Sequence, residues 1–78
     1  MNSKYPEHYI VGERPVKVVE TENSGLTCLA YNWGTGEFER DMSYMLKVRT
    51  MEGEVDAVSE EKFNLHVENL RAKLKNND

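Results

Sequence analysis

The chain has 78 residues, of which 31% are charged and 38% hydrophobic, and its formal net charge is −4. This length allows one domain, and the apolar fraction is too high for a wholly disordered chain. The mild excess of carboxylates disfavours non-specific binding to nucleic-acid phosphates, and no apolar run is long enough to span a membrane. A single cysteine cannot form a disulfide within the chain, which favours a reducing, cytoplasmic location.

The segment before residue 14 has no regular apolar period, and Pro6 and Gly12 interrupt it. We interpret residues 1–13 as an N-terminal arm that is flexible or partly docked, frayed over residues 1–4 and touching the core near residues 9–11.

Three strands are predicted next, because β-branched or alternating residues are separated by turn sequences. The turn sequences are Asn23-Ser24-Gly25 and Gly34-Thr35-Gly36. The predicted strands cover residues 15–21, 26–33 and 37–40. Because the connections are short, these strands predict a three-stranded antiparallel meander.

Residues 42–48 fit two patterns. Met42, Met45 and Leu46 suit a short helix with Asp41 as its N-cap. Tyr44, Leu46 and Val48 alternate, as in a fourth strand. Met and Leu favour the helix slightly, and the strand remains the alternative.

A C-terminal helix is the clearest element, over about residues 59–75. Ser59 is a suitable N-cap, and Glu60 and Glu61 complement the positive end of the helix dipole. One apolar stripe follows, at spacings of four, three and four: Phe63, Val67, Leu70 and Leu74. The predicted fold is therefore α+β: a single domain over residues 14–75, a meander packed by this helix, and a polar tail at 76–78.

No catalytic, cofactor-binding or metal-binding motif is present. The possible metal ligands His8, Cys28 and His66 lie far apart in the sequence and lack the usual ligand spacing. Cys28 stands in an apolar strand without a neighbouring base, which is typical of a core residue. The glycines of residues 34–36 fit a hairpin turn rather than a phosphate-binding loop. The carboxylates of residues 52–61 fit a solvated surface, with a docking patch for a basic partner as the alternative.

The second predicted strand is apolar on both faces, which is unusual for a half-exposed antiparallel strand. We expect the C-terminal helix to cover the face with the small residues Cys28 and Ala30. The other face carries Leu29, Tyr31 and Trp33. It is either covered by residues 9–11 or 42–48, or it forms an exposed patch that binds a partner.

Leu65 and Ala72 are weaker candidates for partner binding, because they lie seven residues apart on the helix face opposite the stripe. An isolated exposed Leu is the simpler interpretation. We therefore expect a non-enzymatic protein-interaction or regulatory domain, with a protein partner or self-association. The alternative is a small nucleic-acid-binding domain that uses aromatic residues on its sheet.

Overall fold

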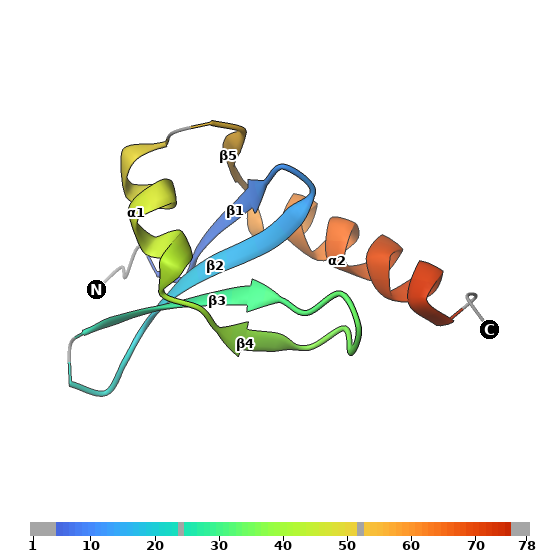
Figure 1. Cartoon of the computed structure of the whole chain (residues 1–78), viewed down its shortest axis with the longest axis horizontal. Helices are drawn as coiled ribbons and strands as arrows, with labels where there is room; N and C mark the ends of the chain where they lie inside the picture. Colours follow the sequence, from blue (N-terminus) through green and yellow to red (C-terminus); the bar gives the residue numbers. More distant parts are fainter. Residues whose placement is uncertain (1–4, 24, 52, 76–78) are drawn as a thin grey trace.

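The computed structural model describes residues 5–23, 25–51 and 53–75. The predicted fraying at residues 1–4 and the polar tail at 76–78 lie outside these ranges. The elements, in chain order, are β1 (Glu7–Val11), β2 (Arg14–Glu20), β3 (Leu26–Tyr31), β4 (Phe38–Arg40), α1 (Ser43–Thr50), β5 (Val55–Val58) and α2 (Glu60–Lys75). Figure 1 shows their arrangement.

The predicted α+β class is confirmed: a five-stranded antiparallel sheet carries two helices. Its strand order is β4-β3-β2-β1-β5. The meander is present as β2, β3 and β4, and it is extended by two strands that the sequence pattern did not predict, β1 and β5. Strand β1 comes from the segment interpreted as an arm. Pro6 and Gly12 bound this strand instead of interrupting it. Gly12, with φ +64°, forms the turn that pairs Val11 with Arg14.

The ambiguous segment after β4 is the helix α1, as the slight preference for helix indicated. The N-cap of this helix is Met42, so the prediction of Asp41 at that position is wrong by one residue. The Asp41 carboxylate nevertheless accepts hydrogen bonds from the backbone N–H and the hydroxyl of Ser43, the first residue of the helix. These hydrogen bonds also lower the pKa of Asp41. Helix α1 carries the chain from β4 at one edge of the sheet to β5 at the other, across one face.

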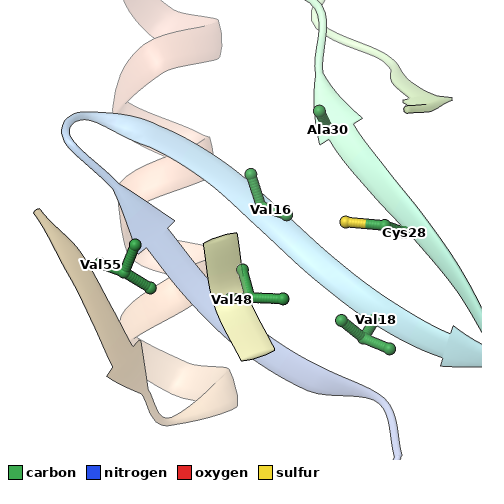
Figure 2. Close-up of a cluster of buried hydrophobic side chains, with 6 residues drawn as sticks. All are labelled: Val16, Val18, Cys28, Ala30, Val48 and Val55. Atoms are coloured by element: carbon green, nitrogen blue, oxygen red, sulfur yellow. The ribbon is translucent and has the colours of Figure 1, made fainter. Parts of the chain in front are cut away.

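The face under α1 holds the main core. Val16 and Val18 of β2, Cys28 and Ala30 of β3, Val55 of β5 and Val48 of α1 are all buried there (Figure 2). Our expectation that the C-terminal helix covers Cys28 and Ala30 is therefore wrong, because α1 takes that side. The small side chains do leave room for a helix, but the helix that packs against them is α1, which connects β4 to β5 across this face.

The opposite face of the sheet carries α2. A second core joins Phe63 and Val67 of this helix to Tyr31 of β3, with Phe38 of β4 beside them. The rings of Phe63 and Phe38 stack with centroids 5.7 Å apart. The predicted burial of the stripe is confirmed for Phe63 and Val67, whereas Leu70 and Leu74 are partly buried.

Polar contacts fix the position of α2 along its length. Ser59 caps its N-terminus, since the Lys62 N–H donates to Ser59 Oγ at 3.1 Å. Midway, His66 Nε2 donates to the Glu13 carbonyl oxygen at 2.7 Å. Near the other end, Arg71 Nε donates to the Gly36 carbonyl oxygen at 2.9 Å. The helix therefore runs from β5 past the β1–β2 turn to the loop between β3 and β4.

Candidate functional site

The three residues of the predicted patch have different environments. Tyr31 is 1% exposed beneath α2, so the hypothesis that its ring forms an exposed surface is wrong. Neither segment covers it, because residues 9–11 lie within the sheet as part of β1 and residues 42–48 pack on the other face. Leu29 is partly buried, and Trp33 is 48% exposed. Trp33 is therefore the member of the patch that offers a large accessible apolar surface.

Trp33 lies beyond the end of β3, in the β3–β4 loop, and not in the strand as predicted. The Asn32 side chain shapes this loop, because its Oδ1 accepts hydrogen bonds from the N–H groups of Gly34 and Thr35 at 2.8 and 3.2 Å. The Trp33 ring nevertheless meets the Tyr31 ring edge to face, with centroids 5.5 Å apart. The buried tyrosine thus supports one side of the tryptophan.

Gly36 closes the same loop against α2. It is buried and has φ +77°, a conformation that other residues adopt at a cost. A Cβ atom at this position would lie 3.4 Å from Leu74 Cδ2 and 3.5 Å from Arg71 Cγ. The predicted hairpin turn over residues 34–36 is confirmed, and its last glycine allows close contact with the helix.

An open pocket of about 220 Å³ lies between this loop and the last turns of α2. Tyr31, Trp33, Leu70, Lys73 and Leu74 line it. Its surface is mainly apolar, and the Lys73 side chain adds a cation. Pockets for small molecules and cofactors commonly measure roughly 300–1,000 Å³. This one is smaller, so it suits an anchoring side chain better than a cofactor.

The apolar stripe predicts Leu70 and Leu74 in the core, so sequence reasoning misses this pocket. The different lengths of the helix and the strands could have indicated this pocket. A helix of 16 residues is about 24 Å long, whereas a strand of five residues spans about 17 Å. The last turns of α2 therefore extend past the strands, as Figure 1 shows. Apolar residues on those turns therefore meet the end of β3 and the loop that follows it.

The charge on α2 is divided along its length. Glu60 and Glu61 stand in its first turn, and the last carboxylate of the helix is Glu68. Residues 69–75 contain no carboxylate and carry the cations Arg71, Lys73 and Lys75. The pocket thus lies at the basic end of α2, in a chain whose net charge is −4.

The weaker candidates lie on the outer face of α2. Leu65 is 58% exposed, and Ala72 is exposed as well. Because α1 packs on the opposite face of the sheet, it does not cover Leu65. A contact between these residues and a second chain remains a prediction.

Cys28 and His8 both pack against residues of the hydrophobic cores, on opposite faces of the sheet. Cys28 is fully buried, and burial, with a smaller contribution from Asp41, raises the pKa of its thiol to about 11. His8 lies on the other side of the sheet, where its ring is 4.8 Å from the Phe63 ring. Burial lowers the pKa of His8. The sheet therefore separates the thiol from this imidazole.

Within the described ranges, no three His, Cys, Asp or Glu side chains gather in a way that could hold a metal ion. In the same part of the chain, neither helix is long and apolar enough to cross a membrane. No protein-family model, no curated protein and no solved structure matches this sequence or fold.

Proposed function

We propose that this chain is a non-enzymatic protein-interaction domain that holds an apolar side chain of a partner in the pocket beside Trp33. The observation that carries the proposal is the half-exposed Trp33 at the edge of an open, mainly apolar pocket. Tryptophan is strongly enriched among the residues that dominate binding energy at interfaces. The other aromatic residue that lines the pocket, Tyr31, is buried.

The pocket is suited to recognition because its walls are held in place before any partner arrives. The Tyr31 ring packs against the Trp33 ring, and the hydrogen bond from Arg71 to Gly36 joins the loop to the helix. A preorganised site loses less entropy on binding than one that must order itself.

The arrangement supports protein binding over base stacking on the sheet. Helix α2 lies over Tyr31, and Phe38 is stacked on Phe63 on one side and has the Lys17 ammonium 4.7 Å from its centroid. These rings are therefore not open to bases. Among Tyr31, Trp33 and Phe38, the aromatic residues that could stack bases, Trp33 alone is exposed.

The test is a selection of displayed peptides on the intact immobilised chain, with a Trp33→Ala variant as the counter-selection. Peptides that bind the natural chain and not the variant support the proposal. Leu65→Ala is the matched control, since it removes an exposed apolar side chain elsewhere on the molecule. If every selected peptide binds all three proteins equally, the proposed site is wrong.

A further inference from the structure

We infer that the partner segment bound by this pocket is acidic: an apolar anchor residue flanked by carboxylates. This inference rests on the proposed function and adds the chemistry of the ligand. It starts from the position of Lys73, which lines an otherwise largely apolar pocket. A carboxylate next to the anchor residue would reach this ammonium group as the anchor enters.

The surroundings of the pocket extend the same charge. Lys73 and Lys75 are exposed in the last turn of α2, and Arg71 lies two residues before Lys73. The β3–β4 loop opposite contributes one carboxylate, Glu37. Since the chain as a whole is acidic, this local excess of cations would direct an acidic segment to the pocket and away from most of the surface.

Arg71 and Lys73 differ in the interactions that they make. The Arg71 guanidinium is already used in the hydrogen bond to the Gly36 carbonyl, so it helps to build the pocket wall. Within the described residues, no hydrogen bond or ion pair engages the Lys73 ammonium, and the Lys73 side chain lines the pocket. Lys73 is therefore the cation through which the partner's charge is recognised.

A nucleic acid would also meet these cations, but the pocket favours a peptide. A base carries ring nitrogens and exocyclic polar groups around its edge, and leaving them without hydrogen-bond partners on burial is costly. Leu70 and Leu74 offer none, and Lys73 supplies donors without an acceptor. An aliphatic or aromatic side chain fills such walls without this cost.

The experiment uses three pools of short synthetic peptides with a central Leu, Ile, Met or Phe. The flanking residues are all Glu in one pool, all Gln in the second and all Lys in the third. Binding to the intact chain is measured by Trp33 fluorescence and by retention on the immobilised protein. We expect the Glu pool to bind most tightly and to lose affinity with added salt.

The decisive variant is Lys73→Glu, and Lys62→Glu is its matched control, because it makes the same charge change near the opposite end of the helix. Lys73→Glu should weaken binding of the Glu pool about three- to tenfold, and Lys62→Glu should change it less than twofold. Both side chains are exposed, so both variants should keep the fold.

The outcomes separate the two proposals. If the Gln or Lys pool binds as tightly as the Glu pool, and Trp33→Ala abolishes that binding, the inference of an acidic partner is wrong and the binding pocket stands. If no pool shows Trp33-dependent binding, the proposed function fails as well. Tighter Trp33-dependent binding of single-stranded oligonucleotides, or a dimer that Trp33→Ala dissociates, would also overturn an acidic peptide as the partner.

Discussion

The inner face of α2 allows a graded test of how this small domain is stabilised. Phe63 is 2% exposed and packs between two aromatic rings, so Phe63→Ala should cost about 3–5 kcal/mol. A core of this size supplies about 3–5 kcal/mol in total. We therefore expect Phe63→Ala to unfold the domain, and a milder change is needed to measure the contribution of this face.

Val67→Ala is that milder change. It removes two methyl groups from a buried side chain, which costs about 1.6 kcal/mol at about 0.8 kcal/mol per group. Alanine is the better helix former, which returns about 0.5 kcal/mol. The net loss is about 1 kcal/mol. A small domain has a urea dependence near 1 kcal/mol per molar, so the midpoint should fall by about 1 M.

The assay is urea unfolding followed by far-ultraviolet circular dichroism, with Leu65→Ala as the control. Leu65 is on the same helix, two residues away, but it is largely exposed, so its loss should change stability by less than about 0.5 kcal/mol. Equal midpoints for Val67→Ala and Leu65→Ala would refute the assignment of the inner face of α2.

Three further predictions concern the loop, the pH dependence and the thiol. Gly36→Ala should destabilise the domain more than Gly12→Ala in urea unfolding, because both positions have positive φ but only Gly36 packs against the Leu74 side chain; equal losses would show that this packing has no consequence. Burial lowers the pKa of His8 below its ordinary 6.5, so the unfolded chain binds more protons just below that pH. The contribution of His8 should be present above about pH 6.5 and decline as the pH falls through the lowered pKa, and His8→Gln should remove this part of the pH dependence of the midpoint; an unchanged profile would contradict it. Cys28, with its pKa raised to about 11, should react slowly with a thiol reagent in the native protein and rapidly in urea, whereas rapid labelling without urea would show that the core under α1 opens readily.

The elements that local chemistry specifies were predictable. Ser59 caps α2 because its hydroxyl satisfies a free backbone N–H of the first turn, and this interaction needs no distant residue. The spacing of Phe63 and Val67 marks the buried face of that helix in the same way. Turn sequences and β-branched runs likewise located three of the five strands.

The strands at the ends of the sheet could not be assigned from local sequence. Residues 7–11 form a strand because β2 and β5 pair with them on either side, and β5 is 44 or more residues away along the chain. Short segments of this kind have weak intrinsic preferences, and partners distant in the sequence select their conformation.

The sequence by itself determined that each face of β3 must be covered by the chain or bound by a partner, because its apolar residues alternate to both sides. The tertiary structure decided which helix covers which face. The connection through α1 crosses the sheet on the Cys28 side, which leaves the Tyr31 side to α2. It also decided where the candidate site lies. Trp33 and Leu74 line one pocket because a long helix extends past short strands to a loop 41 residues earlier in the chain, and no local sequence pattern predicts this arrangement.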